Sequence, residues 1–292
     1  EAEVSQYLEI NNVIQGIFWT ANKLYGLSFR ERTEDYPQYH KQQQSWDVID
    51  KKGNLIAIFY SDYYPRDGKG AGAWCGRFRP QSYDGAMRVQ PIVTNVCNMT
   101  LPTEEGGPAL QTVDNVLTMF HEFGHALHSF FRDVQYEGTG GVERDFVELP
   151  SQINEHWAFE PEVLRQYARH YRTGEVIPQE LVEKIDASSK YGQGFATVEY
   201  LAASYVDLDL HYLTEMPKKL DVMKFQEEKM RKRGMPSQIL PRYSVTNFSH
   251  TMGGGYSAGY YSYIWAEVLD ADAFEAFKET GDIFNQQVAE RF

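Results

Sequence analysis

The sequence predicts a mainly helical fold with one small β-sheet, and two patterns of hydrophobic residues support this. From residue 112 onward, apolar side chains recur at the 3.6-residue spacing of helices, in segments near 112–132, 150–170, 179–190, 194–214, 221–232 and 256–280. Before that point, residues 46–99 hold short runs of strand-forming residues between turns. We therefore expect one domain over residues 1–292, with a sheet region at 46–99 and a helical region at 112–292.

The N-terminal part of the chain is predicted in more detail from its turns. A first helix over residues 7–25 has apolar residues at helical spacing, and Gly26 supplies a stop signal. The sheet region alternates turn residues with β-branched and aromatic ones. Its strands are expected at residues 46–49, 55–60, 73–78 and 90–99, the first two as a hairpin.

Composition excludes some classes of partner. The 292 residues are 42% hydrophobic and 24% charged, as in ordinary globular proteins. The net charge of −13 argues against a nucleic-acid partner, which needs a basic footprint; it favours solubility, or weak steering of cationic peptides. No apolar run approaches the roughly twenty residues of a membrane span. We expect a monomer without nucleic-acid or membrane partners.

Two further features concern the compartment. Cys75 and Cys97 have no CxxC spacing, so buried free thiols are favoured, although one disulfide stays open. The chain starts at Glu1 without an initiator methionine, and its last ten residues form a helix-like pattern without a stop signal. We expect a fragment cut at both ends. A cytoplasmic location is favoured, with a periplasmic one open because the N-terminus is missing.

The motif that indicates chemistry is HExxH, inside the helix predicted near 112–132. Residues four apart lie on one face of a helix, so His121 and His125 can direct two imidazoles at one metal ion. Glu122 can then act as a general base on the attacking water without being a ligand. Thr112 is a suitable N-cap, and Asp114 is favourable in the first turn.

The surroundings of the motif favour a metal over a metal-free polar network. Phe120, Leu127, Phe130 and Phe131 predict a buried helix, in which an unsatisfied cluster of histidine and glutamate would be costly. A catalytic zinc site needs a third protein ligand and one open position.

The third ligand is not fixed by spacing. The extended pattern HExxHxxGxxH is excluded, because it would need glycine at position 128 and histidine at 131. Four residues lie at a plausible downstream distance: Glu143, Glu148, Glu155 and His156.

Three stretches, residues 120–128, 144–157 and 248–265, resemble the thimet oligopeptidase family of zinc metallopeptidases, in the same order and over nearly the whole chain. The resemblance implies a zincin-like metallopeptidase catalytic domain that binds one zinc ion per chain. It implies that Glu148 is the third ligand, with His121 and His125. Glu155 and His156 then lie on the next helix as packing partners or as support for the ligands.

The third stretch places histidine and tyrosines around a run of three glycines. Carried over from the family motif, Tyr256 and Tyr263 are candidates for hydrogen bonding to the oxyanion of the transition state. His250 is the candidate for holding the substrate backbone. Tyr260 and Arg242 are substrate-binding candidates, the arginine for a free carboxylate, with Arg77 as an alternative. The competing interpretation is a tyrosine-rich packing face beside an ordinary glycine turn.

The resemblance implies zinc-dependent hydrolysis of peptide bonds in short peptides. Within the family, the motifs are most similar to the bacterial peptidyl-dipeptidase, which releases C-terminal dipeptides. An endopeptidase similar to oligopeptidase A is the alternative, and so is a peptide-binding fragment that is inactive through truncation. A purely structural zinc site is disfavoured, because such sites usually have four protein ligands, often cysteines, and neither Cys75 nor Cys97 lies near the motif.

Overall fold

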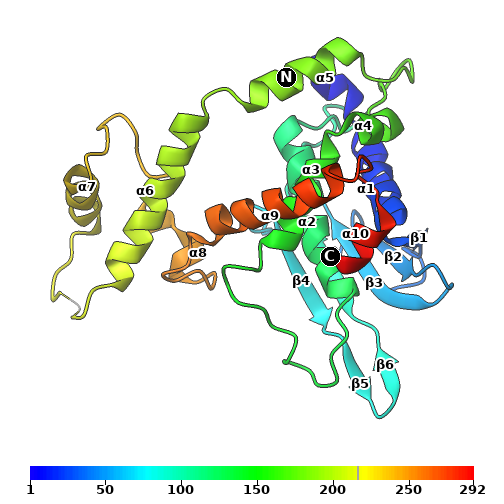
Figure 1. Ribbon diagram of the computed structural model, residues 1–292, viewed down its shortest axis with the longest axis horizontal. Helices are drawn as coiled ribbons and strands as arrows, with labels where there is room; N and C mark the ends of the chain where they lie inside the picture. The colour runs from blue at the N-terminus through cyan, green and yellow to red at the C-terminus, as the bar shows by residue number, and fades with distance from the viewer. Residues whose placement is uncertain (216) are drawn as a thin grey trace. The chain divides into compact units, whose positions relative to one another are not determined.

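The computed structural model describes residues 1–215 and 217–292 and confirms a mainly helical fold with a small sheet (Figure 1). The helices are α1 (Ile10–Tyr25), α2 (Val113–Phe130), α3 (Leu149–Ala158), α4 (Pro161–Tyr167), α5 (Gln179–Ser189), α6 (Gln193–His211), α7 (Val222–Lys232), α8 (Ser249–Met252), α9 (Ser262–Lys278) and α10 (Gln286–Arg291). The strands are β1 (Ser28–Glu31), β2 (Gln44–Ile49), β3 (Leu55–Asp62), β4 (Trp74–Arg79), β5 (Ser82–Asp84), β6 (Met87–Val89) and β7 (Ile92–Val96).

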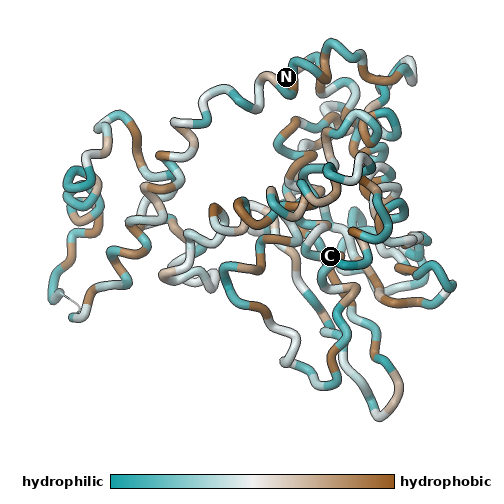
Figure 2. The backbone as a smooth tube through the Cα atoms, viewed as in Figure 1, coloured by the Kyte–Doolittle hydropathy of each residue, from teal (hydrophilic) through white to brown (hydrophobic). Residues whose placement is uncertain are grey.

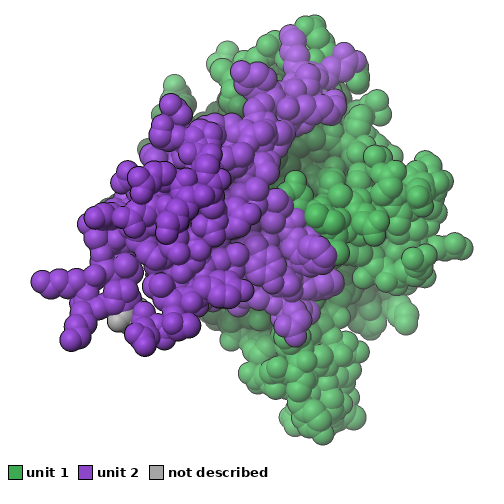
Figure 3. Space-filling model, turned by 60° about the vertical axis from the view of Figure 1, so that its left-hand side comes forward, with its two compact units in different colours: residues 1–141, 149–182, 267–292 green, residues 142–148, 183–266 purple. Residues whose placement is uncertain are grey.

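The chain divides into two compact units, coloured separately in Figure 3. Unit 1 comprises residues 1–141, 149–182 and 267–292, and it contains the sheet and the HExxH helix. Unit 2 comprises residues 142–148 and 183–266, and it contains α6, α7 and α8.

The main sheet of unit 1 has five strands in the order β1-β2-β3-β7-β4. The expected hairpin is β2 paired with β3, and Trp46 lies opposite Phe59. Strands β3 and β7 run parallel, while β4 pairs antiparallel with β7 at the edge. Strand β1 was not predicted, because only Phe29 in it is apolar and most of its residues are exposed.

Helix α2 packs against the sheet through its aromatic face. The ring of Phe123 contacts those of Phe18, Phe59 and Phe130, with centroids 5.6 to 6.0 Å apart. Burial of this face fixes the orientation of α2, so that its opposite face presents the HExxH side chains. Phe131, expected to be buried, is 47% exposed because α2 ends at the residue before it.

Helix α3 approaches α2 closely at Gly124. A Cβ atom at this glycine would lie 2.3 Å from the carbonyl oxygen of Pro150 and 2.6 Å from the Cα atom of Ser151. Both are backbone atoms, so no side-chain rotation could relieve the clash. Gly124 therefore sets the distance between α2 and the start of α3.

We expect Gly124→Ala to destabilise the protein by about 1–3 kcal/mol, the usual result of overpacking. The sign is decisive, because alanine in place of glycine normally stabilises a helix by about 1 kcal/mol. Gly194→Ala in α6, where a new Cβ meets no atom within 4 Å, is the matched control and should be neutral or stabilising. Urea unfolding of both variants measures the difference; equal stabilities would contradict this role of Gly124.

Unit 2 has small apolar clusters of its own. One comprises Ala202, Val206, Met230 and Val245, and another comprises Ala203, Phe248 and Tyr260. Both are built on α6, and Figure 2 shows polar and apolar colours alternating along this helix. One face of α6 therefore packs on α7, and another packs on the segment that contains the predicted tyrosines.

Two predicted helices differ in their boundaries. The segment near 150–170 is two helices, α3 and α4, because Pro161 begins a new first turn. The segment near 256–280 becomes helical only at Ser262, because residues 256–259 form a turn in which the φ angle of Ala258 is 55°. Both cysteines are free thiols, and in the part of the chain described no helix is long and apolar enough to cross a membrane.

Candidate metal centre

Helix α2 brings the two histidines of the motif together. Thr112 caps the helix as predicted, its side chain accepting a hydrogen bond from the amide of Asn115. The imidazole rings of His121 and His125 lie edge to face, with centroids 5.0 Å apart. Both rings are partly exposed, whereas Glu122 between them is 5% exposed. The helix thus presents two ring nitrogens beside a buried carboxylate.

Glu148 completes a group of three metal-ligating side chains. One atom from each of His121, His125 and Glu148 lies within 4.8 Å of the other two. Two imidazoles and a carboxylate form a donor set used by catalytic zinc, with the fourth position left for water or substrate. Residue type and spacing therefore fit a catalytic zinc ion.

The position of Glu148 follows from the packing of α3. Glu148 is 2% exposed and immediately precedes Leu149, the first residue of that helix. Because Gly124 lets the start of α3 lie against α2, the residue before α3 is brought to the histidines. Of the four candidates from the sequence, Glu148 is the one in the metal-ligating group, and Glu143 is exposed.

Glu155 supports a ligand instead. Its Oε1 atom lies 2.7 Å from the Nδ1 atom of His121. A histidine that donates Nδ1–H to a carboxylate has a fixed tautomer and ring orientation, and it offers Nε2 to a metal. His156, the next residue, contacts α9 instead. Its Nε2 lies 2.6 Å from Oδ1 of Asp270, and its ring stacks on Phe274.

We expect Glu155→Gln to weaken zinc binding by about 10- to 100-fold, the usual effect of losing such a supporting carboxylate. Competition with a fluorescent zinc chelator measures the affinity. Glu162→Gln, at an exposed position of α4, is the control and should bind zinc as the wild type does. Unchanged affinity in the Glu155 variant would show that His121 is oriented by other contacts.

The predicted tyrosines and histidine come together within unit 2. The hydroxyl of Tyr256 donates a hydrogen bond to Oε1 of Glu148. The rings of Tyr256 and Tyr263 stack with centroids 5.4 Å apart. His250 in α8 faces both, with centroids 6.0 and 6.1 Å away. The structure therefore brings three sequence-predicted residues together, and one of them, Tyr256, contacts the carboxylate of the metal-ligating group.

The electrostatics of this cluster favour neutral hydrogen-bond donors. Burial raises the pKa of Tyr256 and of Tyr263, and the nearby Glu148 carboxylate raises both further. Both phenols therefore keep their protons in the neutral range. Burial, followed by the charge of Arg242, lowers the pKa of His250, and Glu148 partly offsets this. The imidazole is thus neutral at pH 7, and its buried Nδ1 has no hydrogen-bond partner among the described residues.

The predicted substrate-binding residues are placed differently. Tyr260 is 3% exposed and packs edge-on against Phe248, with centroids 4.7 Å apart. Arg242 is exposed, and its guanidinium lies 6.0 Å from the ring of Tyr243. Both roles stay predictions. Sequence reasoning missed Arg144, whose guanidinium lies 4.7 Å from the centre of the Tyr256 ring.

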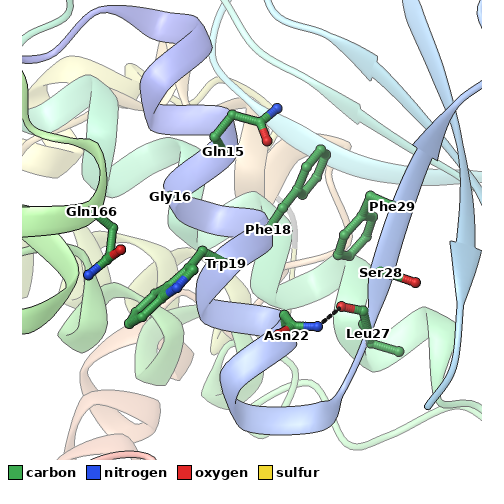
Figure 4. A pocket seen from close by; sticks show the side chains of 9 residues that line it. All are labelled: Gln15, Gly16, Phe18, Trp19, Asn22, Leu27, Ser28, Phe29 and Gln166. Carbon is green, nitrogen blue, oxygen red and sulfur yellow. Dashed lines mark hydrogen bonds between the residues drawn. The ribbon is translucent and has the colours of Figure 1, made fainter.

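A separate pocket lies in unit 1 between α1, β1 and α4 (Figure 4). Phe18, Trp19 and Gln166 are among the residues that line it, and the side-chain Nδ2 of Asn22 donates to the backbone carbonyl of Leu27 at its edge. None of the metal-ligating residues is in its lining, and neither is any charged residue. Its chemistry offers no catalytic group.

Comparison of the sequence with known proteins identifies the family of this chain. A model of Peptidase family M3 matches residues 1–292. The chain belongs to Peptidase family M3. It is 42% identical over 287 residues to the dipeptidyl carboxypeptidase of Escherichia coli (strain K12). The aligned region covers 97% of this chain and 42% of that protein. It is 36% identical over 300 residues to oligopeptidase A of Salmonella typhimurium. This aligned region covers 100% of this chain and 43% of that protein.

The chain thus spans less than half the length of these two M3 relatives. A solved structure of a putative oligoendopeptidase F from Bacillus anthracis matches with a TM-score of 0.46 at 15% identity, and it covers 75% of this chain and 31% of that one. Membership of family M3, and with it the resemblance noted in the sequence, rests on the family model and on the two relatives.

Proposed function

We propose that this chain is the metal-binding part of a zinc peptidase that releases dipeptides from the C-termini of short peptides. The observation that supports it best is the group of His121, His125 and Glu148 beside the buried Glu122. Membership of family M3 supports a peptidase, and the higher identity to a dipeptidyl carboxypeptidase than to an oligopeptidase A favours the exopeptidase.

The residues divide the reaction among them. Zinc, held by His121, His125 and Glu148, would supply a Lewis acid that polarises the scissile carbonyl. Glu122 accepts a proton from the attacking water and delivers it to the leaving amine. Tyr263 donates a hydrogen bond toward the negative charge that develops on the carbonyl oxygen, and Tyr256 does the same when its hydroxyl turns from Glu148 to the substrate.

His250 and the arginines act on the substrate in this proposal. A neutral imidazole can donate to or accept from the peptide backbone without adding charge, and this suits His250. A free substrate carboxylate needs a cation, for which Arg242 is the candidate from sequence. We propose one zinc ion per chain, a monomer, and peptides as the partners, with neither nucleic acid nor membrane involved. We place the protein in the cytoplasm, with the periplasm as the alternative.

Hydrolysis of peptides by the full-length protein tests the function. A peptide with a free C-terminus and the same peptide amidated are each incubated with and without a chelator, and the products are weighed by mass spectrometry. Successive loss of C-terminal dipeptides from the free peptide alone, abolished by chelator and restored by zinc, is expected. Internal cuts in both peptides would favour an endopeptidase similar to oligopeptidase A. An absence of cleavage would leave a peptide-binding role.

A further inference from the structure

The segment between α8 and α9 contains the tyrosines of the site, and α6 of unit 2 holds it through a buried carboxylate. We propose that Asp207 is a positioning residue: its carboxylate holds the 256–259 turn in the conformation that keeps Tyr256 at Glu148. Only the expected effect of this residue on kcat rests on the proposed function. The contacts that support it lie entirely within unit 2.

The carboxylate of Asp207 is fully used. Its side chain is completely buried, and Oδ1 accepts a hydrogen bond from the amide of Ala258 at 2.9 Å. Oδ2 accepts one from the amide of Tyr260 at 3.0 Å. His211, one turn further along α6, lies with Nδ1 2.9 Å from Oδ1. A buried carboxylate is costly unless it is hydrogen-bonded, and here each oxygen has a backbone partner in the same short segment.

The backbone that these bonds hold is strained. The amide of Gly259 donates to the carbonyl of Tyr256 at 2.8 Å, which closes a four-residue turn. Ala258 occupies the third position of this turn with a φ of 55°, and within the described ranges it is the only non-glycine residue with positive φ. That position in such turns normally takes glycine or asparagine. A strained residue persists only where its surroundings hold it, and Asp207 provides that hold.

Helix α6 makes a further hydrogen bond to the same segment, at the carbonyl of Tyr260. The hydroxyl of Tyr200, two turns before Asp207 on α6, donates a hydrogen bond to the carbonyl of Tyr260. The backbone of Tyr260 is therefore fixed at its N–H and at its C=O by one helix. Tyr256 lies at the start of the same turn, and its hydroxyl reaches Glu148. If the turn relaxed, Tyr256 would lose its position relative to that carboxylate.

Asparagine at position 207 removes the hold without changing the size of the side chain. An amide has one accepting oxygen and one donating nitrogen, so one of the two backbone N–H groups would face a donor. The turn would lose one bond and gain an unfavourable contact. Glycine at position 258 has the opposite effect, because it adopts positive φ without strain and needs no external hold.

The test uses the full-length, zinc-loaded protein. We expect Asp207→Asn to lower kcat by about 10- to 100-fold with little change in KM, the size of effect that small misplacements of catalytic groups produce. The double variant with Ala258→Gly should recover most of that loss, and Ala258→Gly alone should be close to wild type. Asp209→Asn on the same helix, which breaks the pair with Arg233 on the α7 side, is the matched control and should keep full kcat.

A second measurement does not depend on activity. Hydrogen exchange followed by mass spectrometry should show that the amides of residues 258 and 260 exchange faster in the Asp207→Asn protein than in the wild type, with zinc content unchanged. If that variant does not fold, Tyr200→Phe tests the same hold and should also lower kcat without raising KM.

The outcomes separate this inference from the proposed function. Unchanged exchange in the Asp207→Asn protein would overturn the inference, and so would a loss of kcat that Ala258→Gly does not restore. If Tyr200→Phe is used instead, an unchanged kcat would overturn it. Failure of the wild type to cut any peptide would contradict the proposed function, and the exchange measurement would still decide whether Asp207 holds the turn.

Discussion

Replacing Glu122 by glutamine is expected to reduce kcat by about 10³- to 10⁴-fold while zinc remains bound, at the upper end of what general base catalysis provides. The amide has nearly the shape of the carboxylate but cannot accept a proton from water. Glu122 is 5% exposed on α2, between two histidines that supply metal-ligating atoms, so its replacement leaves the donor set intact. Steady-state kinetics on a quenched-fluorescence peptide and zinc analysis of the same sample measure both effects.

Two controls make the result specific. His125→Ala should also abolish turnover, but with loss of zinc, because it removes a ligand. Glu162→Gln, at an exposed position away from the metal-ligating group, should keep wild-type kinetics. A Glu122→Gln protein with bound zinc and near-normal kcat would show that another group takes the proton, and the mechanism proposed above would be wrong.

The sequence predicted the metal-binding helix well because its determinants are local. The capping residue Thr112, the apolar spacing and the four-residue interval of the histidines all lie within one segment, and they needed no tertiary information. The strands with strong apolar runs were predicted for the same reason. Strand β1 was missed because its pairing with β2, and not its own residues, makes it a strand.

The third ligand could not be predicted from local sequence patterns alone. Spacing left four candidates, because the approach of α3 to α2 is set by a contact between Gly124 and the backbone around Pro150, which no sequence pattern reports. The resemblance to a family singled out Glu148, and the metal-ligating group in the structure contains it. The link between Glu155 and His121 spans 34 positions and was open in the sequence for the same reason.

The tyrosine segment was the least predictable part. A helix was expected from residue 256, but the strained turn at Ala258 delays it to Ser262. Without that turn, Tyr256 would lie on the helix itself. What places Tyr256 at Glu148 is a turn held by α6 from about fifty residues earlier in the chain, a tertiary effect of the kind that overrides local propensity.

Tyr263→Phe is expected to lower kcat by about 10²- to 10³-fold, with KM changed far less, because it removes one donor aimed at the developing oxyanion. Burial and the nearby Glu148 carboxylate raise the pKa of Tyr263, so the phenol keeps its proton throughout the neutral range. A change of pH within that range therefore does not remove this hydrogen-bond donor, whereas the substitution does. Phenylalanine preserves the ring that stacks on Tyr256. Zinc content and thermal stability should therefore stay close to wild type.

Tyr261→Phe is the matched control for this substitution. Tyr261 is two residues away and 39% exposed, and its hydroxyl donates to Asp145 at 2.8 Å. Its removal deletes one phenol from the same segment without touching Glu148, so kcat should change less than threefold, the scale of a lost surface hydrogen bond of about 0.5 kcal/mol. Equal losses in the two variants would mean that the segment as a whole, and not the Tyr263 hydroxyl, sustains catalysis. A large loss confined to Tyr263→Phe, with zinc retained, would locate transition-state stabilisation at that hydroxyl.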